Sequence, residues 1–207
     1  MPASRRSLIV VAALGAALTV TACATVPANA TVPDSSTATH SVSTGTFDVP
    51  ATATSAFTYD VAQVPVGARI VVRAVKIADH KTLIRLRVRG LLPGETYGAH
   101  VHYLACGATG AAAGAHYQNI PDPAVGGSET VSSTNPAYAN PANEVWLDFV
   151  TNAKGNGRAY TVVDWRFRPT AAGTTRSVIL HIDPTSTGGT VPPGNAGARL
   201  GCLNARF

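Results

Sequence analysis

The sequence predicts an all-β domain, built as an antiparallel sandwich or barrel, over residues 55–207. First, residues 84–89 (IRLRVR) alternate between aliphatic residues and arginines, the pattern of a strand with one buried face. Second, this and other short apolar stretches are separated by turns rich in Gly, Pro and Asn. Third, no stretch of this domain has the apolar periodicity that is typical of a helix.

Strands and loops can be placed in chain order. Residues 78–81 (ADHK) form a hairpin connection and residues 92–95 (LPGE) form a turn. Six strands are expected from their alternation or apolar content, at residues 68–77, 82–89, 99–103, 145–150, 158–163 and 177–182. Two long Gly- and Pro-containing segments, 104–143 and 183–198, interrupt this spacing. Long loops on a rigid β scaffold often carry function, so we expect the functional residues near them.

Residues 1–22 have the pattern of an export signal. Arg5 and Arg6 precede an apolar core, residues 8–20, that is too short to span a bilayer comfortably. The sequence VTAC, which ends at Cys23, resembles a bacterial lipobox, in which the cysteine becomes the lipid-bearing N-terminus. We therefore expect an exported protein, lipid-anchored to the outer face of the bacterial cell membrane or held in the envelope. The alternatives are an ordinary signal peptide with an incidental cysteine, and export by either the Sec or the twin-arginine route.

Residues 23–54 predict a disordered tether that follows the lipidated cysteine. They consist almost entirely of Ala, Thr, Val, Ser and Pro, a composition that cannot bury a core, and His40 within them is expected to be solvated. Loss of residues 1–22 removes Arg5 and Arg6 and no acid, so the formal charge falls from +5 to +3. With no run of Lys or Arg, this mild charge argues against a nucleic-acid partner but not against a small anion.

Two cysteines remain in the domain, Cys106 and Cys202. Disulfides persist outside the cytoplasm, so we expect a bridged pair rather than two free thiols. Such a bridge would close a long loop and stabilise the fold by about 4 to 5 kcal/mol in the chain-entropy model.

Four histidines suggest a metal site. His100 and His102 lie two apart on an expected strand, so their side chains project from the same face. His116 lies in the first long loop and His181 ends an apolar strand, while residues 97–120 contain no Asp or Glu. A metal there would have nitrogen ligands, which suit copper, zinc, iron or nickel. Considered singly, the first pair could be a chance alternation and His181 a core histidine bonded to a carbonyl.

At these residues the chain resembles the copper/zinc superoxide dismutases. The matching motifs follow the family's order from about residue 65 to the end: GAHVH (98–102), Cys106, AHYQN (115–119), SVILH (177–181) and GNAGARLGC (194–202). The resemblance implies an eight-stranded antiparallel Greek-key β-barrel with long functional loops. It also implies conversion of superoxide to O₂ and H₂O₂ through a Cu(II)/Cu(I) cycle.

The resemblance implies a role for each matching residue. It implies that one copper ion is bound by His100, His102, His116 and His181. It further implies that Arg199 lines the channel to the metal and that Cys106 pairs with Cys202. A guanidinium beside the metal would attract and orient the superoxide anion. Arg199 and His116 are therefore the residues expected to act in catalysis.

One half of the family's metal site is missing. The zinc site of the family needs two more histidines and an aspartate, and this chain has no histidine between His116 and His181. Carboxylates alone are poor substitutes, so zinc is not expected and the chain resembles a copper-only member. His116 then needs another partner to fix its orientation. Glu144 and Asp148 are the candidates, although either could be a surface or turn-capping acid.

Two other functions stay open at this point. A copper-storage protein of the envelope would use the same barrel and histidines, and the short segment after His181 favours it, but storage does not need Arg199. A degenerate barrel kept as an interaction module would not need four histidines. The sequence does not distinguish a monomer from a dimer.

Overall fold

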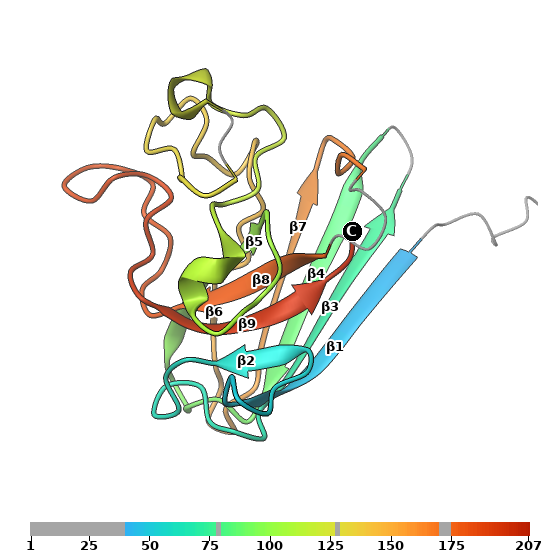
Figure 1. The fold of residues 1–207 in the computed structure, drawn as a ribbon, viewed down its shortest axis with the longest axis vertical. Coiled ribbons are helices and arrows are strands. Elements are labelled where there is room, and N and C mark those ends of the chain that lie inside the picture. The colour runs from blue at the N-terminus through green and yellow to red at the C-terminus, as the bar shows by residue number, and fades with distance from the viewer. Residues whose placement is uncertain (1–39, 78–79, 127–128, 170–174) are drawn as a thin grey trace, which may run out of the picture. The chain divides into compact units, whose positions relative to one another are not determined.

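The computed structural model describes residues 40–77, 80–126, 129–169 and 175–207. Within these ranges nine strands form one curled sheet, a nearly closed and mostly antiparallel barrel (Figure 1), in the order β6-β5-β8-β9-β2-β1-β3-β4-β7. The strands are β1 (His40–Asp48), β2 (Ala56–Thr58), β3 (Arg69–Lys76), β4 (Thr82–Arg89), β5 (Thr96–His102), β6 (Phe149–Val150), β7 (Gly157–Val163), β8 (Arg176–His181) and β9 (Arg199–Ala205). The predicted all-β class is confirmed, with nine strands in place of eight. No helix in the described ranges has the length and hydropathy needed to cross a membrane.

β1 shows that the predicted end of the tether, at residue 54, is wrong. His40 is the first residue of this strand rather than part of a linker, and β1 pairs antiparallel with β3. Phe47 is fully buried in the core, and Gly45 lies so close to β2 that a Cβ on it would be 2.5 Å from that of Ala56. Only glycine fits this tight position without a shift of the neighbouring strand. The predicted signal peptide, Cys23 and the rest of the tether up to residue 39 lie outside the described residues.

The other expected strands are largely present. β3, β4, β7 and β8 lie within one residue of their predicted bounds at either end, and β5 begins three residues earlier than predicted. The strand predicted at 145–150 is regular only in β6, although Val145 and Leu147 still exchange backbone hydrogen bonds with β5. β2 and β9 were not among the predicted strands, because β2 has only three residues and β9 (RLGCLNA) has little polar and apolar alternation.

Crossing connections place the strands in two groups. The chain passes from β4 to β5, returns through β7 beside β4, and crosses again to β8 beside β5, which is a Greek-key path. β1, β3, β4 and β7 therefore pair with one another, while β5, β8 and β9 form the other part of the barrel (Figure 1). Alternate side chains of both groups fill one core, which includes Ile70, Ile84, Leu86, Val101, Val178, Leu180 and Leu203.

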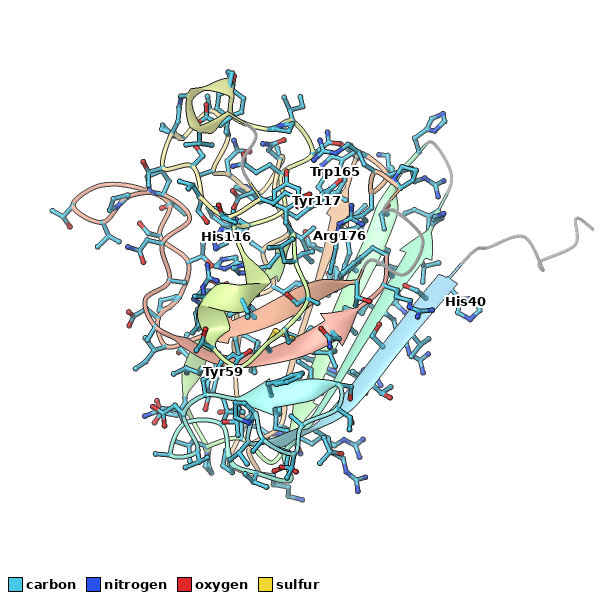
Figure 2. The ribbon with its side chains drawn as sticks, in the orientation of Figure 1. His40, Tyr59, His116, Tyr117, Trp165 and Arg176 are labelled. Atoms are coloured by element: carbon cyan, nitrogen blue, oxygen red, sulfur yellow. A yellow bond between two sulfur atoms is a disulfide. The ribbon has the colours of Figure 1, made fainter. Side chains whose placement is uncertain are left out.

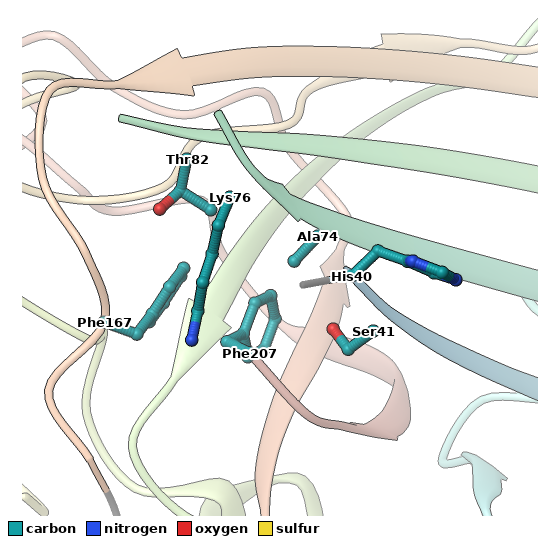
Figure 3. A pocket seen from close by; sticks show the side chains of 7 residues that line it. All are labelled: His40, Ser41, Ala74, Lys76, Thr82, Phe167 and Phe207. Atoms are coloured by element: carbon teal, nitrogen blue, oxygen red, sulfur yellow. The ribbon is translucent and has the colours of Figure 1, made fainter. Parts of the chain in front are cut away.

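A small cavity of about 80 Å³ lies near the start of β1 (Figure 3). Phe167 and Phe207 stack in its wall with ring centroids 4.4 Å apart. Thr82 also lines it, but its hydroxyl donates to the carbonyl of Trp165 at 2.8 Å. The rest of the lining is His40, Ser41, Ala74 and Lys76.

Candidate metal centre

The site is built on β5 and its neighbour β8. His100 and His102 project from the same face of β5 and are both fully buried. The antiparallel register places Gly98 of β5 opposite His181, the last residue of β8, so His181 joins the same side. A Cβ on Gly98 would lie 2.4 Å from the carbonyl oxygen of Asp183, so only glycine lets the following loop approach this closely.

His116 reaches the site because the loop after β5 folds back along that strand. The amide of Tyr117 donates to the carbonyl of Val101 at 2.8 Å, and an antiparallel bridge sets His116 opposite His102. Successive side chains of an extended segment point to opposite sides, so His116 and Tyr117 face different volumes. The sequence spacing of the loop could not have shown this pairing.

Tyr117 anchors the loop that carries His116 (Figure 2). Its ring is completely buried, with the ring of Trp165 at 5.7 Å and the guanidinium of Arg176 at 4.5 Å from its centroid. Its hydroxyl accepts a hydrogen bond of 2.9 Å from the backbone amide of Arg168. A rigidly held neighbour fixes the backbone of His116, which limits the positions that the imidazole can take.

Hydrogen bonds to backbone carbonyls fix the tautomers of two histidines. Nδ1 of His102 lies 3.0 Å from the carbonyl oxygen of Gly114, and Nδ1 of His181 lies 3.2 Å from that of Gly197. A carbonyl oxygen only accepts, so each Nδ1 carries the hydrogen and each Nε2 keeps its lone pair. These two Nε2 atoms lie 3.5 Å apart, an arrangement that a cation between them would favour.

His100 is held in the opposite tautomer by Thr185. The carboxylate of Asp148 accepts both the hydroxyl and the backbone amide of Thr185, each at 2.6 Å. The Thr185 oxygen is thereby left to accept from Nε2 of His100, also at 2.6 Å. Nδ1 of His100 then carries a lone pair, and it is buried with no hydrogen-bond partner. A buried unpaired nitrogen is unfavourable by itself, and a bound ion would satisfy it.

Glu144 positions His116. Its Oε2 accepts from Nδ1 of His116 at 3.0 Å and from Nε1 of Trp146 at 2.8 Å, and its Oε1 accepts from the amide of Gln118 at 2.8 Å. The Glu144 side chain is only 1% exposed, so these three donors replace water around the carboxylate. Of the two acids offered by the sequence as partners of His116, Glu144 makes the contact, and Asp148 instead acts on His100 through Thr185. Gln118 lies in the matching motif AHYQN but was given no role there, and Trp146 and Thr185 carried no recognisable signal in the sequence.

Burial favours the neutral form of three of the four histidines, His100, His102 and His181. Burial, and then the neighbouring histidines, lower the pKa of His100 and His102 well below its ordinary value. Burial also lowers the pKa of His181 to about 3. Neutral imidazoles keep the lone pairs that metals require. One nitrogen from each of the four histidines lies within 4.8 Å of the others, so the cluster could hold a single metal ion such as copper.

A cleft of about 220 Å³ leads to this cluster. Its wall includes His116, His181, Arg199 and parts of the loops at residues 132–134 and 193–197. Nη1 of Arg199 donates to the carbonyl of Gly110 at 2.8 Å, which fixes the guanidinium. Burial lowers the pKa of Arg199, yet an arginine stays cationic at neutral pH. A fixed positive charge in a narrow cleft attracts small anions.

The predicted disulfide between Cys106 and Cys202 is confirmed. It joins the loop after β5 to β9, and the amide of Cys106 also donates to the side-chain oxygen of Asn204 at 2.8 Å. The same loop supplies the Gly110 carbonyl to Arg199 and the Gly114 carbonyl to His102. The disulfide therefore anchors the segment that orients two groups of the site.

These features define a β-barrel protein with a buried four-histidine site that could bind copper and a cationic cleft above it. No protein-family model matches the chain, and no curated protein matches it. Solved structures that it resembles include the Cu/Zn superoxide dismutase from Brucella abortus, at 21% identity over 80% of this chain and 98% of that one, with a TM-score of 0.49. Others are the clock protein EA4 (19% identity, 82% and 94% covered, TM-score 0.47) and a double mutant of a SOD-like protein from Bacillus subtilis (17%, 80% and 95%, 0.47).

Proposed function

We propose that this chain is a copper-dependent superoxide dismutase of the bacterial cell envelope. The observation that carries the proposal is the convergence of four buried imidazoles, with one ring nitrogen of each within 4.8 Å of the others, beside a cleft that contains Arg199. When bound, copper supplies the one-electron couple by which one superoxide is oxidised to O₂ and a second, with two protons, is reduced to H₂O₂. Storage of copper would use the histidines but has no use for the anion-attracting cleft.

The residues of the protein attract the substrate and orient the histidines of the cluster. Arg199 draws the anionic substrate toward the face of the cluster that His116 and His181 expose to the cleft. Glu144 keeps the hydrogen of His116 on Nδ1, so that Nε2 keeps a lone pair that a metal could use. The proposal includes one copper ion and no zinc, since Nδ1 of His116 already donates to Glu144 and no further histidine lies between residues 116 and 181.

The proposed location is supported by sequence and redox chemistry. The lipobox-like stretch ending at Cys23 predicts a lipid anchor on the outer face of the membrane. The disulfide between Cys106 and Cys202 agrees with an oxidising compartment, because such bonds are rare in a reducing cytoplasm.

Metal analysis combined with superoxide decay tests the proposal. The purified chain, loaded with copper, is expected to bind a single copper ion and to accelerate superoxide decay in stopped-flow measurements. Arg199→Ala should lower the second-order rate by about 10-fold and weaken its dependence on salt, while copper content stays the same. Arg199→Lys, which keeps the charge, serves as the matched control. Copper binding without faster decay would support storage instead, and no copper binding would overturn both functions.

Glu144→Gln is expected to weaken copper affinity or activity by about 10- to 100-fold, as is usual for partners of metal-binding histidines. The amide has nearly the same shape, but it can no longer accept from His116, Trp146 and Gln118 all at once. Competition with a copper chelator and the electron paramagnetic resonance spectrum of Cu(II) would report the change. Glu95→Gln, at an exposed glutamate, is the control and should leave both unchanged.

A further inference from the structure

Six arginines cover the outer side of three adjacent strands, a surface that we call the arginine face. They are Arg69 and Arg73 of β3, Arg85, Arg87 and Arg89 of β4, and Arg158 of β7, and all are exposed. Their neighbours in each strand point into the core, so strand alternation fixes the arginines on the solvent side. Among the described residues, none of the six guanidiniums makes an ion pair or a side-chain hydrogen bond.

The strand register sets these arginines directly opposite one another. The cross-strand pairs are Arg69 with Arg89, Arg73 with Arg85, and Arg87 with Arg158. Like charges at directly opposed positions destabilise a sheet, so folding alone does not favour this arrangement. The chain after residue 22 has a formal charge of +3, which is less than the six positive charges of this face alone. The charge is therefore concentrated here, where an anionic partner would relieve the repulsion.

Exposed apolar side chains lie among the arginines. Tyr160 is 76% exposed and is paired with Arg85, and Val42 is 47% exposed and is paired with Arg73. Val162, two residues beyond Tyr160 on β7, is 46% exposed. Tyrosine and aliphatic side chains interspersed with cations suit the boundary between water and lipid. There the apolar parts of these side chains can contact lipid while the polar ends stay in water.

The arginine face also contains a cleft of about 420 Å³ beside β7. Arg85, Arg87, Arg158 and Tyr160 line it, together with one acid, Asp148. Both oxygens of the Asp148 carboxylate already accept hydrogen bonds, from the amide of Ala99 and from Thr185. Three guanidiniums thus remain available in one concave place, and guanidinium groups bind phosphate oxygens in a bidentate manner.

We propose that the arginine face docks on a bilayer that contains anionic phospholipids, with the guanidiniums on the headgroup phosphates. The cations spread over three strands about 4.8 Å apart and recur about every 7 Å along them, a two-dimensional array that matches a planar field of phosphates better than a single polymer chain. The histidine cluster belongs to β5, β8 and the loop after β5, so docking leaves the cleft at Arg199 open to solvent. The inference depends on neither the proposed enzyme activity nor a lipid at Cys23.

Co-sedimentation of the full chain with vesicles tests this docking. Cys23→Ser is used throughout so that no lipid can be attached there, and vesicles of phosphatidylcholine are compared with vesicles that also contain phosphatidylglycerol. We expect binding to the anionic vesicles, weakened by salt, and little binding to the neutral ones. Arg87→Gln with Arg158→Gln should lower the affinity about 25-fold, which is about 5-fold for each arginine. Lys154→Gln with Arg206→Gln removes the same charge from other exposed positions and should change the affinity little.

Thermal unfolding separates docking from a structural role. Because Arg87 and Arg158 repel each other, their double glutamine variant should unfold at the same temperature as the parent or a higher one. Arg87→Lys with Arg158→Lys keeps the charge and should keep most of the binding even if the glutamine variant folds poorly. Equal binding to both kinds of vesicle, an equal loss in the Lys154 and Arg206 control, or arginine-dependent binding to duplex DNA that is tighter than to anionic vesicles would each overturn the proposal.

Discussion

Replacing Cys106 and Cys202 together with alanine is expected to lower the free energy of unfolding by about 4 to 5 kcal/mol. The disulfide joins residues that are 96 positions apart, and a cross-link over so long a loop removes much of the conformational freedom of the unfolded chain. Alanine is the appropriate replacement because Cys202 is fully buried, where a serine hydroxyl would lack a partner. Denaturation in guanidinium chloride, compared between the parent and the double variant, measures the difference.

The same double variant should also bind copper less tightly. Without the cross-link, the segment that supplies the carbonyls of Gly110 and Gly114 is held to β9 only by weaker contacts, such as the bond from Cys106 to Asn204. Cys23→Ala, which leaves the disulfide intact, is the control for both measurements. A loss below about 1 kcal/mol would show that the unfolded chain gains little freedom when the bond is absent.

Local rules were sufficient for the strands that carry most of the site. Alternation located β4, and the spacing of His100 and His102 placed both on one face of β5, because a strand repeats every two residues. The same rule failed at β1. Its residues HSVSTGTFD have a linker-like composition, and they form a strand because β3 and β2 supply partners on both sides. Pairing of this kind depends on tertiary structure rather than on local composition.

The residues that hydrogen-bond to the histidines could not be assigned from the sequence. Glu144 and Asp148 lie four residues apart and looked equivalent as partners of His116. The segment between them is not a regular strand, so the two carboxylates serve different histidines. Thr185 contacts His100 across 85 positions, and only the path of the loop after β8 creates that contact. Short-range patterns and the family resemblance pointed to the four histidines of the cluster, whereas the residues that orient them depend on how distant loops meet.

The metal-free protein is expected to lose stability steeply as the pH falls below about 6.5. Burial lowers the folded-state pKa of His100 and His102, and lowers that of His181 to about 3, whereas each titrates near 6.5 in the unfolded chain. Below pH 6.5 the unfolded chain therefore binds more protons, so the stability that is fully present above this pH is lost on acidification. The slope approaches about 1.4 kcal/mol per pH unit for each of these histidines.

Urea denaturation of the metal-free chain, from about pH 7.5 down to about pH 4.5, measures this slope. His181→Gln should reduce the slope of unfolding free energy against pH by the contribution of one histidine, about 1.4 kcal/mol per pH unit. His80→Gln, at an exposed hairpin position, is the matched control. Bound copper should raise the free energy of unfolding above pH 6.5. Its affinity should fall at lower pH, because the metal binds only neutral imidazoles and protons compete for the same nitrogens. An unfolding free energy that stays flat over this range would contradict a cluster of buried neutral histidines, and with it the physical basis for a metal site at this position.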